Sequence, residues 1–144
     1  MNLATLIWKS VAAHGDRPAL AKGDEVLCSF SEFAKRISSL AAGMQKKFNL
    51  SPGDRVALAM KNCPEYWEVL FACWHAGLTA VPMNAKLHAK EFEYILGNSG
   101  TKLCFVSSGI DCPFGNSIPV PSKDFQNLQG EPQNPHPSGP ADVA

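Results

Sequence analysis

One feature of this sequence constrains the fold more than any other. In residues 55–107, short apolar runs alternate with segments of helical period. The runs hold mainly small and branched apolar side chains, which is typical of strands that are covered on both faces. They span residues 55–60, 79–82 and 103–107. Strands that alternate with helices through short turns form a parallel sheet with right-handed crossovers. The sequence therefore predicts an α/β fold in three layers, with a partly parallel sheet flanked by helices.

The two helices between these strands have recognisable ends. Pro64 suits the first position of the first helix, Glu65 lies in its positively polarised first turn, and Gly77 ends it. The second helix is predicted over residues 89–96, closing near Gly97.

A helix, a hairpin and a long helix are predicted ahead of the first of these strands. The hairpin joins residues 19–22 to residues 26–29 through a turn that contains Gly23. We expect this N-terminal antiparallel hairpin to add an edge to the sheet. The long helix begins with Ser29 and Glu32, which have the spacing of a capping box.

The chain of 144 residues has the length of about one domain, but its composition changes near residue 107. Residues 1–107 carry a net charge of +3, whereas residues 108–144 carry −3 and hold seven of the eleven prolines. Helical and strand periods also end near this point. We therefore predict an α/β subdomain over residues 1–107, as part of a larger domain, and a Pro-rich irregular connection over residues 108–144.

Net charge, the longest uncharged span and the cysteine spacing restrict the expected partners and the location of the protein. The net charge of zero gives no electrostatic reason to expect a nucleic acid or an anionic membrane. The longest uncharged span, residues 69–85, is interrupted by His75, Gly77 and Pro82, so no membrane span is expected. The five cysteines lack metal-binding or Cys-x-x-Cys spacing, which predicts reduced structural thiols and a cytoplasmic protein.

No catalytic apparatus is recognisable in the sequence. The glycine-rich loops that cradle nucleotide phosphates and the elbow that presents a nucleophilic serine are both missing. His75 lies near the end of an apolar helix and is interpreted as a packed or dipole-paired histidine instead of a general base. His88, Glu91 and Glu93 are interpreted as residues of a helix start. We expect no catalytic residue and no metal site in this chain.

Four segments nevertheless resemble, in order and spacing, the core motifs of the acyl-adenylate-forming enzymes, a superfamily of AMP-dependent synthetases and ligases. Residues 28–33 (CSFSEF) are similar to the family's Ser/Thr-Tyr-x-Glu-Leu helix start, and residues 53–57 (GDRVA) to its Gly-Asp-x-Val strand entry. Residues 74–84 (WHAGLTAVPMN) resemble its Ala-Gly to Val-Pro-Leu/Ile-Asn/Asp motif. Residues 88–107 follow its next helix and strand, with His88 in place of the usual Thr.

This resemblance implies a ligase of the acyl-CoA synthetase type. Such enzymes use ATP and Mg²⁺ to convert a carboxylic acid, in many cases a fatty acid, to an acyl-adenylate, and then pass the acyl group to coenzyme A. The family's phosphate-binding loop follows a segment like residues 140–144, so the chain is identified as an N-terminal fragment that ends before this loop. ATP, Mg²⁺ and coenzyme A are thus implied for the full-length enzyme. The fragment is expected to bind none of them, to be inactive, and to need the missing C-terminal part as its partner.

One binding residue follows from the resemblance. Residues 84–87 (NAKL) correspond to the family's Asn-Pro-Arg-Leu, whose basic residue in some ligases helps to hold the nucleotide phosphate of coenzyme A. Lys86 would do so as a point charge, without the fork of an arginine. The alternative is that Lys86 is a solvated lysine on a turn.

Two other interpretations remain open. The chain could be a stand-alone α/β interaction module, because Pro132 and Pro135 have the P-x-x-P spacing of a polyproline ligand. It could also be a truncated product without a function of its own.

Overall fold

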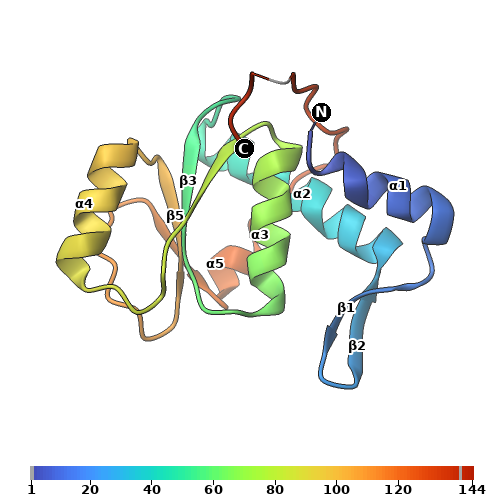
Figure 1. Ribbon diagram of the computed structural model, residues 1–144, viewed down its shortest axis with the longest axis horizontal. Helices are drawn as coiled ribbons and strands as arrows, with labels where there is room; N and C mark the ends of the chain where they lie inside the picture. The colour runs from blue at the N-terminus through green and yellow to red at the C-terminus, as the bar shows by residue number, and fades with distance from the viewer. Residues whose placement is uncertain (1, 140) are drawn as a thin grey trace.

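The computed structural model describes residues 2–139 and 141–144, and its centre is a parallel sheet (Figure 1). Its strands are β3 (Arg55–Ala59), β4 (Thr79–Pro82), β5 (Leu103–Ser107) and β6 (Ser117–Val120). They lie in the order β4-β3-β5-β6, and every neighbouring pair is parallel. In the middle of the sheet, Val56 lies opposite Ala80 of β4 and Leu103 of β5. The predicted α/β architecture is confirmed.

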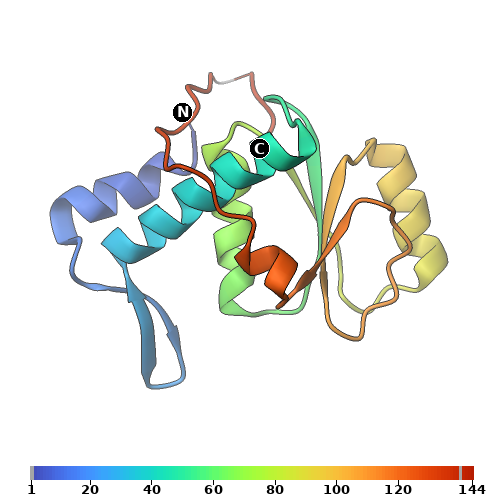
Figure 2. The same cartoon turned by 180° about the vertical axis from the view of Figure 1, so that it is seen from behind.

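Helices cover both faces of the sheet (Figures 1 and 2). On one face lie α2 (Phe30–Phe48) and α3 (Pro64–His75), and on the other lies α4 (Ala89–Ser99). Successive residues of β3 point to opposite faces: Val56 and Leu58 join the larger core beside α2 and α3, and the small side chains of Ala57 and Ala59 join the smaller core beside α4.

The N-terminal elements form a unit beside α2. They are α1 (Thr5–His14), β1 (Pro18–Lys22) and β2 (Glu25–Ser29). The predicted antiparallel hairpin is present, but it is a separate two-stranded sheet, and the expectation that it extends the edge of the main sheet is wrong. Backbone hydrogen bonds at its base explain this, because Phe30 donates to Arg17 (3.0 Å) and Ser31 donates to Gly15 (3.0 Å). They hold the hairpin at the start of α2, from which it projects away from the sheet (Figure 1).

The predicted capping box at the start of α2 is confirmed. The Ser29 hydroxyl accepts from the Glu32 amide at 3.3 Å, and the Glu32 carboxylate accepts from the Ser29 amide at 2.8 Å. The end of α4 differs from the prediction, since the helix continues past Gly97 and ends at Gly100. Gly100 adopts the left-handed backbone (φ +64°) that closes a helix, whereas Gly97 lies within the helix.

Residues 108–144, expected to be irregular, contain the strand β6 and the short helix α5 (Lys123–Gln126). β6 was missed because Pro119 interrupts its strand pattern. This strand lies at the edge of the sheet, where a residue that cannot donate a hydrogen bond is tolerated. Phe125 of α5 packs edge-on against Phe105 of β5, with ring centroids 6.0 Å apart, and so extends the larger core.

Within the described residues, a helix with the length and apolar character of a membrane span is absent.

Candidate functional site

The carboxyl ends of the parallel strands meet at one edge of the sheet, the edge where ligands bind in many open α/β folds. Lys61 follows β3 and Ser107 ends the neighbouring β5. The Lys61 amide donates to the Ser107 hydroxyl at 3.0 Å, and the Lys61 ammonium donates to the Ser108 carbonyl at 3.0 Å. These bonds tie the ends of two strands together and leave the lysine exposed at the edge.

Lys86 lies at the same edge, on the turn that leads from β4 into α4. The Asn84 side-chain oxygen accepts from the Lys86 amide at 2.9 Å, so the backbone of this turn is held by an Asx turn. The Lys86 side chain is exposed, and no hydrogen bond or ion pair to its ammonium group is found among the described residues. The geometry is thus compatible with both interpretations of Lys86, a phosphate contact and a solvated lysine.

His75, by contrast, is a fully buried residue at the end of α3. Its Nδ1 accepts from the indole Nε1 of Trp8 at 3.3 Å, and its Nε2 lies 2.7 Å from the Gln133 carbonyl. Because a carbonyl oxygen only accepts, Nε2 must carry the proton. Burial lowers the pKa of His75, and the hydrogen bond to Gln133 opposes this effect to a smaller extent. With both ring nitrogens engaged, His75 is a packed histidine.

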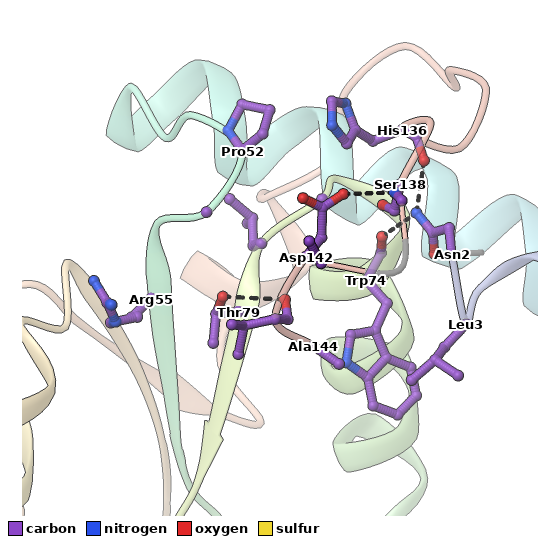
Figure 3. A pocket seen from close by; sticks show the side chains of 16 residues that line it. Asn2, Leu3, Pro52, Arg55, Trp74, Thr79, His136, Ser138, Asp142 and Ala144 are labelled. Carbon is purple, nitrogen blue, oxygen red and sulfur yellow. Dashed lines mark hydrogen bonds between the residues drawn. The ribbon is translucent and has the colours of Figure 1, made fainter.

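At the opposite, amino-terminal edge of the sheet lies a cavity of about 300 Å³ (Figure 3). Arg55 and Thr79 contribute from the starts of β3 and β4, and Trp74 from α3. The final segment of the chain completes the wall with His136 and Asp142. The indole nitrogen of Trp74 is buried without a hydrogen-bond partner among the described residues.

Hydrogen bonds fasten this final segment to the body of the protein. The Asn2 side-chain amide donates to the Trp74 carbonyl at 2.5 Å and to the His136 carbonyl at 2.9 Å. The Ala80 amide of β4 donates to the Ala144 carbonyl at 2.9 Å, so the last residues run beside this strand. The cavity is therefore partly covered by the final segment, which is hydrogen-bonded to the rest of the protein. It lies at the edge opposite to Lys61 and Lys86.

The chemistry that the described residues bring together is limited. Among residues 2–139 and 141–144, no group of three His, Cys, Asp or Glu side chains is placed to hold a metal ion. His88 donates its backbone amide to the Glu91 carboxylate at 2.9 Å, which confirms Glu91 as a residue of the helix start. The structure thus presents a scaffold with two exposed lysines, Lys61 and Lys86, at its carboxyl edge.

The P-x-x-P segment is bound to the protein's own helices. Between its two prolines, the Gln133 amide donates to the Ser38 hydroxyl at 2.7 Å, and this hydroxyl donates to the Gln133 carbonyl at 2.7 Å. The His136 amide donates to the His75 carbonyl at 2.7 Å. A polyproline ligand offers its prolines and carbonyls to a partner. In this conformation the Gln133 carbonyl is already engaged by Ser38 and His75, whereas Pro132 is exposed.

The sequence indicates Lys86 as a candidate binding residue, but it does not predict the contacts of Lys61 with Ser107 and Ser108. The two segments are 46 residues apart in the sequence, and they meet only because β5 pairs with β3 instead of with β4. A polar residue at the end of each predicted strand was the available signal, but strand order is not contained in local periodicity.

Comparison with known proteins assigns the scaffold to a family. The sequence profile described as AMP-binding enzyme matches residues 7–139. A long-chain-fatty-acid–CoA ligase of Haemophilus influenzae is 40% identical over 100 residues, which cover 69% of this chain and 18% of that protein. A fatty acid–[acyl-carrier-protein] ligase of Streptomyces coeruleorubidus is 44% identical over 71 residues, 49% of this chain and 14% of that protein.

The fold is also similar to that of solved ligase structures. A benzoate CoA ligase of Burkholderia xenovorans superposes with a TM-score of 0.83 at 16% identity, covering 96% of this chain and 31% of that chain. The chain thus spans less than a quarter of the length of the two curated relatives. The profile match, over more than half of the chain, shows that the chain belongs to the AMP-binding family of acyl-adenylate-forming enzymes.

Proposed function

We propose that this chain is the N-terminal part of an acid–thiol ligase that activates a carboxylic acid with ATP and passes the acyl group to coenzyme A. The observation that carries the proposal is the profile match over residues 7–139, together with a relative whose name is long-chain-fatty-acid–CoA ligase. That name makes a fatty acid the first substrate to test. The carrier-protein ligase among the relatives makes an acyl carrier protein the alternative acceptor.

In this proposal, residues 1–144 supply framework, and the reacting groups come from the remainder of the enzyme. ATP supplies the adenylate, and coenzyme A supplies the thiol. The described residues offer no cluster of ligands for Mg²⁺, so we assign it no position in this chain. The exposed lysines at the carboxyl edge are the chain's own groups with the charge to contact phosphate.

The proposal is tested by an acyl-transfer assay on the protein at the length of its relatives. We expect coenzyme A thiol to be consumed only when ATP and a carboxylic acid are both present, and a series of fatty acids of increasing length to identify the preferred acid. A parallel assay with acyl carrier protein distinguishes the acceptors. Consumption of ATP without any thioester product with either acceptor would contradict the proposed reaction.

Within this function we propose that Lys86 contacts a phosphate of coenzyme A. The Asx turn at Asn84 fixes its backbone at the carboxyl edge, and its ammonium group is exposed to solvent. In the enzyme at the length of its relatives, Lys86→Ala should raise the KM for coenzyme A about two- to fivefold, the effect of one exposed charge pair, with kcat unchanged. Lys86→Arg should retain the low KM, since a guanidinium also binds phosphate.

Lys90 provides the matched control for this test. It is an exposed lysine in the first turn of α4, four residues after Lys86, and Lys90→Ala removes the same charge. Equal KM values for coenzyme A in the two alanine variants would mean that Lys86 is a solvated lysine on a turn.

We also propose a cytoplasmic location. The five cysteines are all free thiols, which is the usual state in a reducing compartment. Fractionation of cells that produce the protein would test it, and recovery in a membrane or secreted fraction would contradict it.

A further inference from the structure

Two cysteines that the proposed ligase reaction does not use lie side by side in the smaller core. Cys104 is a buried residue of β5, and Cys112 is a partly buried residue of the loop that follows this strand. Their sulfur atoms are 3.9 Å apart. The loop lies on the side of the sheet that α4 covers (Figures 1 and 2), and both cysteines pack in the core around Phe92 and Leu96.

The placement suits a covalent bond between the two thiols. A disulfide requires the sulfur atoms to approach to about 2.05 Å. Cys112 lies in a loop between β5 and β6, so it can move toward Cys104, which the parallel pairing of β5 with its two neighbours holds in place. The two sulfur atoms would have to approach by about 1.9 Å, through a movement of Cys112.

The other three cysteines are separated from this pair by the sheet. Cys28, Cys63 and Cys73 pack in or against the larger core on the opposite face, whereas Cys104 and Cys112 belong to the smaller core. In the folded protein, a second thiol within reach of Cys112 is therefore provided by Cys104. This arrangement predicts one specific pairing.

We propose that Cys104 and Cys112 form a reversible intramolecular disulfide when the protein meets a peroxide. The more accessible Cys112 thiolate attacks a peroxide oxygen, which gives a sulfenic acid and releases hydroxide. The Cys104 sulfur then attacks the Cys112 sulfur, the S–O bond breaks, and water leaves as the S–S bond forms. In total, two thiols and one hydrogen peroxide yield one disulfide and two waters, and a dithiol reductant reverses the reaction by exchange.

Two features of the site set the rate and the consequence. Burial raises the pKa of both Cys104 and Cys112, so little thiolate is present at neutral pH and the reaction should accelerate as pH rises. The bond would close the segment that contains Ser108, whose carbonyl accepts from Lys61 at the carboxyl edge. Oxidation should therefore reduce amide hydrogen exchange within residues 104–112.

Peptide mapping of the folded chain tests the proposal. The folded, reduced protein is treated with hydrogen peroxide and then unfolded in urea, so that a maleimide can block the remaining thiols, including the buried ones. Its digest is then analysed by mass spectrometry. Chymotrypsin is the suitable protease, because it cleaves after Phe105, between the two cysteines. We expect a cross-linked peptide pair containing Cys104 and Cys112, with the other three of the five cysteines alkylated, and full reversal by dithiothreitol. Mapping of the unmodified sequence does not depend on whether any variant folds.

Variants and denaturation supply the controls. Cys112→Ser should abolish the cross-link, and Cys63→Ser, which removes another partly buried cysteine, should leave it unchanged. In urea the selectivity should disappear, because pairing then depends on chain proximity and not on the fold. The proposal is overturned if protein oxidised in the folded state leaves Cys104 as a free thiol while Cys112 oxidises further, if Cys112 pairs with another cysteine, or if no cross-link forms.

Discussion

His75 illustrates how one residue connects the two ends of the chain. Its imidazole accepts a hydrogen bond from the Trp8 indole of α1 and donates one to the Gln133 carbonyl of the final segment. The backbone carbonyl of His75 accepts from the His136 amide. The sequence predicted a packed or dipole-paired histidine, and the structure confirms the packing. It could not predict the partners, because Trp8 and Gln133 lie 67 and 58 residues away in the sequence.

The protonation of His75 should make stability depend on pH. Burial holds its pKa in the folded protein below the ordinary 6.5, so the unfolded chain binds more protons than the folded chain as pH falls through this range. Neutral His75 therefore contributes its full stabilisation of the folded state above about pH 6.5, and this contribution is lost progressively as pH falls below that value. The total loss is about 1.4 kcal/mol for each pKa unit by which the folded and unfolded states differ at His75.

Urea unfolding at a series of pH values measures this effect. The free energy of unfolding should fall below pH 6.5, and the fall should be smaller in a His75→Gln variant, whereas His88→Gln, at an exposed position, should follow the unmodified protein. If all three proteins lose stability in parallel, the loss arises from other groups.

At the scale of elements, the helices depend on what packs against them as much as on their own sequences. Gly43 in α2 and Gly97 in α4 are both helical glycines. A Cβ atom at residue 43 would lie 2.6 Å from the Leu128 carbonyl oxygen, because the segment after α5 crosses α2 at this point, whereas a Cβ atom at residue 97 would have no neighbour within 4 Å. The same substitution should therefore have opposite effects in the two helices.

We expect Gly97→Ala to stabilise the protein by about 0.5–1 kcal/mol through helix propensity. Gly43→Ala should destabilise it by about 1–3 kcal/mol, because the Leu128 backbone must move. Chemical unfolding of both variants provides the measurement. A stabilised Gly43→Ala variant would show that residues 128–130 are not docked on α2 in solution.

The elements that sequence predicted correctly are those with a strong local signal. The bounds of β5 follow from one apolar run, and the start of α2 follows from its capping box. The missed features depend on tertiary context. β6 forms despite Pro119 because it lies at an edge, and the hairpin stays apart from the main sheet because its base is bonded to the end of α1.

At the scale of the whole molecule, the chain forms a hydrophobic core on each face of its sheet. Its final residues run beside β4 and leave the carboxyl edge, with Lys61 and Lys86, exposed. The family could be predicted from sequence because four motifs occur in the right order, and each motif is a fold-forming segment. The position of Lys86 relative to Lys61 could not be predicted from sequence, because it depends on the order of the strands in the sheet.

In the proposed function, residues 1–144 supply framework and carboxylate activation requires further residues of a protein at the length of the relatives. Carboxylate-dependent exchange of pyrophosphate into ATP measures the activation step without any acceptor. We expect exchange by the protein at the length of its relatives and none by residues 1–144 alone. Exchange by the 144-residue chain, dependent on an added carboxylic acid, would contradict it.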